Sequence, residues 1–240
     1  MERIAAADRR LVWDACLNVR DLGGLKAANG ATKWGILVRA SSLGELSTAG
    51  RAAMRRHGVR SVIDIRSPEE VVEAPSPYAR GATYRNAQFT LGRTMQIDQA
   101  AVAGTMPAEL ARLARPESGL ADVIQAIAGA EPGIVLHCLA GRDRTGFVVA
   151  ILLSALGVGE DDIVSDYAAS DGELETEYER YITGHADDAG DVRGGIARRE
   201  GTMRAVLATL GAEYGDGATY LRVAGVADLD VERLRAKLLA

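Results

Sequence analysis

The sequence is short of several features that would assign it to a class directly. It contains only two cysteines, Cys16 and Cys138, which are too few for a disulfide framework. Its longest unbroken apolar run, Phe147 to Leu153, is far shorter than the roughly 20 residues that a membrane-spanning helix needs. The residues after Met1 are mostly alanine or charged and offer no apolar core of a signal peptide. We therefore expect a cytoplasmic protein without a membrane span, with export by a route that needs no signal peptide as the alternative.

Charge and histidine content argue against two further classes of function. The 28 lysines and arginines are outweighed by 33 aspartates and glutamates, and the resulting net charge of −5 does not favour nucleic acid as a partner. The three histidines, His57, His137 and His185, are too scattered to indicate a metal-ligand cluster. With 48% hydrophobic residues the chain can bury a large core, and no linker or repeat divides it. We expect one domain over residues 1–240, with no metal or other cofactor.

Strand-like and helix-like segments alternate along the chain. Val59–Ile65 and Ile134–Leu136 are short apolar runs typical of buried strands, while Leu120–Ile127 and Thr145–Leu156 have the apolar spacing and length of helices. This alternation predicts an α/β fold in which a central, mostly parallel twisted sheet is flanked by helices on both faces.

Turn residues predict how the N-terminal part is organised. The turn signal at Ala28–Ala31 lies between Leu25-Lys26 and the extended run Trp34–Arg39. It predicts an N-terminal hairpin within about residues 15–40, formed by these two segments. Further along, Ser47 is placed to cap a helix that ends at Gly58.

The C-terminal third has the composition of helices joined by a loop. Aspartates and glycines are concentrated between residues 187 and 195, which predicts a loop between two helices. Near the end of the chain, Asp228 or Asp230 is placed to cap the last helix, Val231–Leu239.

The segment that follows the predicted strand Ile134–Leu136 carries the chemistry. It reads His137-Cys138-Leu139-Ala140-Gly141-Arg142-Asp143-Arg144-Thr145-Gly146. A loop between a buried strand and a helix N-terminus presents unpaired N–H groups that favour an anion, and Gly141 lets the backbone close around it. Arg144, six positions after Cys138, can hold two oxygens of a phosphate with its planar guanidinium. The same positive surroundings favour the thiolate form of Cys138, so the pattern predicts a nucleophile aimed at phosphorus.

At these residues the sequence resembles the cysteine-dependent phosphatases, whose signature is H-C-x-x-G-x-x-R-[ST]. It is most similar to the bacterial tyrosine/serine and lipid phosphatases, whose loop reads H-C-x-x-G-K-D-R-T-G. Other segments agree in order, namely Asn18–Gly24, Leu37–Ser41, Val62–Ser67 with Glu69-Glu70, Asp166-Tyr167, and Tyr220-Leu221 with Gly225. One position departs from the pattern, because Arg142 stands where the family has lysine. The planar guanidinium of arginine there replaces the compact ammonium of lysine, which affects any contact to a second phosphate or an inositol ring.

The resemblance implies a metal-independent phosphomonoester hydrolase that acts through a cysteinyl-phosphate intermediate. Cys138 is expected to attack phosphorus, and Arg144 to hold the phosphoryl oxygens. The phosphate-binding set is completed by Leu139, Ala140, Gly141, Arg142 and Thr145, and His137 is expected to support the loop. The expected substrate is a phosphorylated protein, phosphotyrosine first, with phosphoserine or phosphothreonine in addition. The alternatives are a phosphoinositide phosphatase and a phosphate-binding module without turnover.

The acid that protonates the leaving oxygen is a choice between two aspartates. Asp143 lies inside the loop beside Arg144 and is our first choice, because a general acid must first lie within reach of the leaving oxygen before its pKa matters. Asp64, at the end of a predicted strand, is the alternative, and the resemblance suggests it as a counterpart of the mobile-loop acid of other cysteine phosphatases. By analogy with members of the family that have lids, residues 87–116 and 173–195 are expected to cover the pocket.

Overall fold

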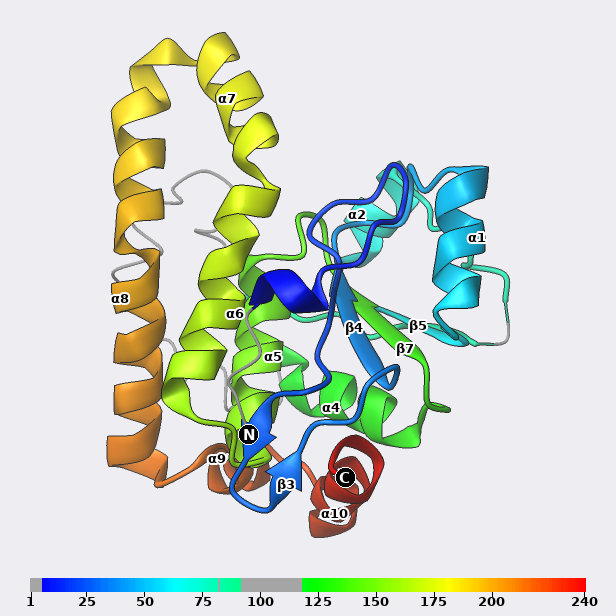
Figure 1. Ribbon diagram of the computed structural model, residues 1–240, viewed down its shortest axis with the longest axis vertical. Helices are drawn as coiled ribbons and strands as arrows, with labels where there is room; N and C mark the ends of the chain where they lie inside the picture. The colour runs from blue at the N-terminus through cyan, green and yellow to red at the C-terminus, as the bar shows by residue number, and fades with distance from the viewer. Residues whose placement is uncertain (1–5, 82, 92–117) are drawn as a thin grey trace.

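The computed structural model describes residues 6–81, 83–91 and 118–240. Its main sheet has five strands in the order β1-β4-β7-β5-β6 (Figure 1). They are β1 (Arg20–Asp21), β4 (Leu37–Ala40), β5 (Ser61–Asp64), β6 (Tyr84–Asn86) and β7 (Ile134–His137). Only β1 pairs antiparallel, with β4, and every other pair is parallel. The predicted mostly parallel sheet is therefore confirmed.

Helices precede, connect and follow these strands. Before and between the early strands lie η1 (Ala6–Arg9), α1 (Thr48–Arg56) and α2 (Pro68–Glu73). The central helices are α4 (Leu120–Gly129), α5 (Asp143–Ala155) and α6 (Glu160–Glu173). The C-terminal part comprises α7 (Glu175–Gly184), η4 (Ala186–Asp188), α8 (Ala189–Tyr214), α9 (Gly217–Val223) and α10 (Asp228–Leu238).

Alternate side chains of the strands feed two separate hydrophobic clusters, one on each face of the sheet. Ile63 and Leu136 pack into the larger cluster, with the buried sides of α4 and α5. Their neighbours Val62 and Val135 point the other way and join Met54 of α1. Because successive strand residues face opposite sides, each four-residue strand supplies both clusters. Helices therefore cover both faces, as the sequence predicts.

The N-terminal hairpin differs in its pairing from the prediction. β2 (Lys26–Ala27) pairs with β3 (Gly30–Ala31) as a small separate ribbon. The longer run Leu37–Ala40 pairs instead with Arg20–Asp21, so the predicted pairing of Leu25-Lys26 with it is wrong. The longer strand belongs to the main sheet because its other edge is occupied by β7.

Two predictions for the C-terminal third need correction. The stretch 187–195 is not a loop, because η4 ends at Asp188 and α8 continues as a helix of 26 residues. Its glycines disfavour helix locally, but Met203 and Val206 further along α8 are fully buried in the larger cluster, and such packing outweighs propensity. The last helix is capped by Ala227 without a side-chain bond, and its aspartates lie in the first turn.

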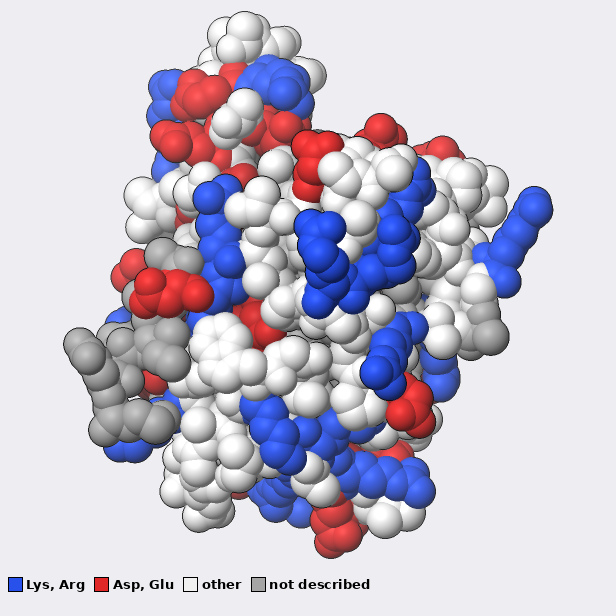
Figure 2. Space-filling model, turned by 45° about the vertical axis from the view of Figure 1, so that its right-hand side comes forward, with Lys and Arg blue, Asp and Glu red and all other residues white. Residues whose placement is uncertain are grey.

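α7 and α8 form an arm that projects beyond the sheet, with η4 at the turn between them (Figure 1). Its projecting end carries both signs of charge on the face that Figure 2 shows. Ion pairs there join Arg180 to Glu177 and Arg193 to Glu179. No helix within the described ranges is long and apolar enough to cross a membrane.

Candidate active site

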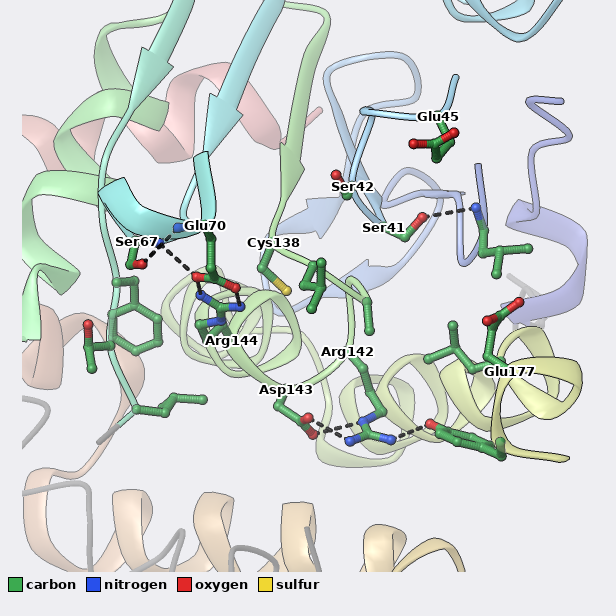
Figure 3. A pocket seen from close by; sticks show the side chains of 18 of the residues that line it. Ser41, Ser42, Glu45, Ser67, Glu70, Cys138, Arg142, Asp143, Arg144 and Glu177 are labelled. Carbon is green, nitrogen blue, oxygen red and sulfur yellow. Dashed lines mark hydrogen bonds and ion pairs between the residues drawn. The ribbon is translucent and has the colours of Figure 1, made fainter. Parts of the chain in front are cut away.

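The site lies where the parallel strands end. β4, β5 and β7 run in the same direction, so their carboxyl ends meet at one edge of the sheet, where α/β proteins bind ligands. Cys138 directly follows β7, and α5 begins at Asp143. The loop between them forms the floor of a pocket of about 950 Å³ (Figure 3). The structure thus brings Cys138, Asp143 and Arg144 to one cavity, as predicted.

The loop backbone is fastened to the protein body by its carbonyl groups. The Asn18 side-chain amide donates to the carbonyl oxygen of Ala140 at 3.0 Å. The Arg39 guanidinium donates to the carbonyl oxygen of Gly141 at 2.6 Å. Both donors come from the N-terminal segments that agree with the family pattern. Asn18 and Arg39 therefore lie beside the loop that follows β7.

The two preceding carbonyl groups are held in the same way. The backbone N–H of Ser42 donates to Leu139 at 2.7 Å, and Nδ1 of His137 lies 3.1 Å from the carbonyl oxygen of Cys138. In a planar trans peptide, the N–H of the next residue points opposite to the carbonyl. With the carbonyls of residues 138–141 bound to the body, the N–H groups of residues 139–142 point the other way. This orientation creates a concave row of donors suited to an anion.

Gly141 has both a backbone conformation and a packing position that exclude a side chain. Its φ is +66°, in the region that residues with a Cβ rarely adopt. A Cβ at this position would lie 2.2 Å from the carbonyl oxygen of Ala40. The glycine therefore lets the loop pass close against the end of β4.

Behind the loop, three arginines surround one aspartate. Asp166 of α6 is 1% exposed and pairs with Arg9 at 2.8 Å, Arg20 at 3.3 Å and Arg39 at 2.5 Å. Burial alone would raise the pKa of Asp166, but the charges of the three arginines hold it below its usual range. Burial, opposed by Asp166, lowers the pKa of Arg20 to about 10, and the charge of Arg39 contributes to this shift.

This Asp166 cluster links α6 to the phosphate loop, because Arg39 contacts both Asp166 and Gly141. Arg20, Arg39 and Asp166 lie within the segments that agree with the family pattern, but no role was predicted for them. Charged residues beside apolar neighbours, such as Val19 before Arg20 and Val38 before Arg39, are the local signal of a buried cluster.

Arg144 is held beside Cys138 by a carboxylate that the sequence analysis did not select. Glu70 accepts from both terminal nitrogens of Arg144, at 2.6 and 2.7 Å (Figure 3). Burial alone would lower the pKa of Arg144, but the hydrogen bond to Glu70 and the negative charge of Cys138 raise it. Arg66, which lies close to Glu70 in the sequence, binds Asp64 instead.

Asp143 lies on the wall of the pocket and is joined to Arg142. Two guanidinium nitrogens of Arg142 donate to Asp143 at 2.9 and 2.7 Å, and the hydroxyl of Tyr167 donates at 3.2 Å. Arg142 also lies over the ring of Tyr178 and donates to its hydroxyl, which connects the loop to α7. Arg142 is only 3% exposed although it lines the pocket, so its guanidinium is committed to these neighbours.

Asp64, the alternative acid, does not line the pocket. Its carboxylate is fully buried, accepts two bonds from the Nε of Arg66 and one from its terminal nitrogen, and accepts a further bond from the Tyr84 hydroxyl. Burial alone would raise the pKa of Asp64, but the bonds from Arg66 and the charge of His137 lower it. For His137, burial lowers the pKa, although the negative charge of Asp64 opposes this shift. Asp64 is therefore enclosed by Arg66 and Tyr84 and lies outside the lining of the pocket.

The remaining predicted residues divide between the pocket and its support. Leu139 and Ala140 line the cavity, whereas the buried Thr145 lies beneath it. Among the described residues, the hydroxyl oxygen of Thr145 has no hydrogen-bond partner. The predicted lid segment 87–116 lies largely outside the described residues, though its first residues 88–91 line the pocket. From the second predicted lid segment, 173–195, α7 supplies Glu177 and Tyr178 to one wall.

Both cysteines are free thiols. Cys138 is 3% exposed, and its sulfur faces the cavity next to the Glu70–Arg144 pair (Figure 3). Cys16 is buried against Ser41, and burial raises the pKa of its thiol to about 11. Within the described ranges, no group of three or more His, Cys, Asp or Glu side chains is placed to hold a metal ion.

Comparison with known proteins agrees with this geometry. Residues 11–240 match the family model described as the tyrosine phosphatase family. A tyrosine-protein phosphatase from Nostoc commune is 33% identical, covering 84% of this chain and 73% of the relative. The triple specificity protein phosphatase PtpB from Mycobacterium tuberculosis is 29% identical, covering 87% of this chain and 92% of the relative. Together with the loop around Cys138, this match over nearly the whole chain shows that the protein belongs to the tyrosine phosphatase family of cysteine-dependent enzymes.

Proposed function

We propose that Cys138 hydrolyses phosphotyrosine in protein substrates in two steps. In the first, the thiolate attacks phosphorus, an S–P bond forms, and the bond from phosphorus to the tyrosine oxygen breaks. In the second, water attacks phosphorus, the S–P bond breaks, and inorganic phosphate leaves with the thiolate restored. The observation that carries the proposal is the loop itself, which lines one cavity with Cys138 and Arg144 while its carbonyl groups are bound to the protein body.

Charge on the transferring group is stabilised by Arg144 and the loop backbone. Preorganised donors of this kind usually supply the largest share of catalysis, because they need no reorientation during the reaction. Thr145 can offer its buried hydroxyl to the neighbouring loop or the sulfur, since no described residue engages it. His137 supports the loop through Cys138 rather than acting on substrate.

Asp143 is the acid and base of this proposal. It donates a proton to the leaving tyrosine oxygen in the first step, and its carboxylate accepts a proton from water in the second. Its position on the pocket wall supports this role, whereas Asp64 is enclosed by Arg66 and Tyr84 away from the cavity.

The pocket wall favours an aromatic phosphoester. Apolar side chains from separate parts of the chain line the same cavity as Cys138, including Leu17, Phe89, Leu139 and Leu174. Such surfaces suit the flat face of a phenyl ring, while phosphoserine or phosphothreonine would leave part of the wall uncovered. We therefore rank phosphotyrosine first and phosphoserine or phosphothreonine second.

Phosphoinositides form the second candidate substrate class, because the family pattern has a lysine at position 142. A polyphosphorylated inositol requires cations beyond the phosphate loop. Apart from Arg144, the arginines that line this pocket in the described part of the chain are Arg142, paired with Asp143, and Arg180, paired with Glu177. This pairing favours a substrate with one phosphate.

A panel of initial rates tests the proposal. Phosphotyrosine and phosphoserine peptides and phosphoinositide vesicles are compared at equal phosphate concentration, with Cys138→Ser as the control. We expect the highest kcat/KM on phosphotyrosine and no turnover by the serine variant. A phosphate-binding module would instead bind the peptides without releasing phosphate, and a lipid phosphatase would reverse the ranking.

A further inference from the structure

Glu70 links the first turn of α2 to the guanidinium of Arg144. One of its carboxylate oxygens, Oε2, accepts from the backbone N–H of Ser67 at 2.8 Å. The same oxygen accepts from Arg144 at 2.6 Å, and the other oxygen, Oε1, accepts from Arg144 at 2.7 Å. Glu70 is therefore fixed at the start of α2 and in turn fixes Arg144.

The rigidity of this arrangement comes from a capping box. The Ser67 side chain accepts from the backbone N–H of Glu70 while the Glu70 side chain accepts from the backbone N–H of Ser67, with Pro68 at the first helical position. Reciprocal bonds of this kind satisfy helix N–H groups and hold the third residue of the helix in one orientation. α2 begins just after β5, so the carboxylate is anchored to the edge of the sheet beside β7.

The geometry leaves Arg144 able to bind substrate. An arginine has five N–H donors, and Glu70 accepts from its two terminal nitrogens at the far end of the fork. The Nε–H and one further N–H on each terminal nitrogen stay available, which suffices for two oxygens of a phosphate. Glu70 and a phosphate can therefore bind the same guanidinium at once.

We propose, building on the function proposed above, that Glu70 is a positioning residue that holds Arg144 in the orientation needed for the transferring phosphoryl group. Without Glu70, the Arg144 side chain, which has four rotatable bonds, must be ordered at each turnover. Misalignment of Arg144 weakens its contacts to the transition state more than its contacts to the bound substrate. The effect should therefore fall mainly on kcat.

Glu70 is unsuited to the acid role that its position near Cys138 could suggest. Burial alone would raise the pKa of Glu70, but the bonds from Arg144 and Ser67 and the charge of Arg66 hold it below its usual range. At neutral pH it is a carboxylate whose two oxygens hold Arg144, so protonating it would weaken the contacts that orient the arginine.

The experiment compares Glu70→Ala and Glu70→Gln with Glu69→Gln, using a phosphotyrosine peptide. Glu69 lies on the same helical turn but is exposed and does not line the pocket, so it makes a matched charge control. For Glu70→Ala we expect kcat to fall about 10- to 100-fold with KM changed less than threefold, since one misaligned contact costs rate on this scale. Glu70→Gln, which keeps one acceptor for Arg144, should lose less, and Glu69→Gln should stay within twofold of the parent.

Thermal unfolding and vanadate inhibition complete the design. Loss of rate with Tm within a few degrees of the parent supports positioning. A Glu70→Ala variant with unchanged kcat, or one with a higher kcat and tighter vanadate binding, refutes it, because Glu70 would then be idle or would compete with substrate. If Glu70→Ala is too unstable to assay, the comparison of Glu70→Gln with Glu69→Gln decides. An unmodified protein with no turnover would refute the proposed function itself, whereas an active parent with an indifferent Glu70 refutes only this inference.

Discussion

Removing the charge of Asp166 should destabilise the protein more than the loss of any surface ion pair. The change Asp166→Asn keeps the shape of the side chain but leaves three buried guanidinium groups with no carboxylate among them. Removing one partner from a buried ion pair costs about 3–5 kcal/mol, because the remaining charge stays desolvated. In a protein whose total stability is roughly 5–15 kcal/mol, this is a large fraction.

The same helix supplies the control. Asp161 of α6 pairs with Arg204 at 2.9 Å, but both side chains are largely exposed, and such pairs contribute at most about 1 kcal/mol. Urea unfolding should therefore show a far larger loss for Asp166→Asn than for Asp161→Asn. Thermal unfolding should show a fall in Tm of roughly 6–20 °C for the buried site. Equal losses for the two variants would refute the reasoning that burial sets the cost.

Three further predictions concern the acid, the substrate and pH. Asp143→Asn should lower kcat on phosphotyrosine peptides by about 10²–10⁴-fold, together with a fall in Tm because the buried Arg142 loses its carboxylate, whereas Asp64→Asn should mainly lower Tm. If the basic limb of the kcat profile disappears in Asp64→Asn and not in Asp143→Asn, the assignment of the acid is wrong. Arg142→Lys should lose the forked contact to Asp143 and the stacking on Tyr178, so the rate on phosphoinositide relative to phosphotyrosine should rise severalfold. An unchanged ratio of the two rates counts against the role given to Arg142. Because the folded-state pKa values of Asp64, Glu70 and Asp166 are held down, their contribution to stability is complete above about pH 5 and is lost progressively as the pH falls below it, which urea unfolding between pH 3 and 7 can measure. Asp166→Asn should show a shallower loss over that range.

Local sequence patterns predicted the elements that depend on neighbours in the chain. Ser47 accepts a bond from Gly50 at the start of α1, as its position before the helix predicts. The spacing of Cys138, Gly141 and Arg144 predicted a loop between a strand and a helix, and the structure has β7 and α5 there. These features need only a few consecutive residues, so the sequence carries their signal directly.

The partners of the charged side chains were not predictable in this way. Arg66 could bind Asp64, Glu69 or Glu70 by sequence distance alone, and the choice of Asp64 left Glu70 for Arg144. The helix through residues 189–195 was likewise missed, because its stability comes from packing further along α8 rather than from its own glycines.

The sequence alone predicted a nucleophile, an anion-binding loop and the alternation of strands and helices, since each depends on short-range spacing. The tertiary structure decided what holds the loop and its arginine in place. Arg39 meets Asp166 across 127 positions, and Arg144 meets Glu70 across 74. Contacts at such separations depend on how the strands are ordered in the sheet and how α6 and α2 pack beside it, and no local pattern encodes that order.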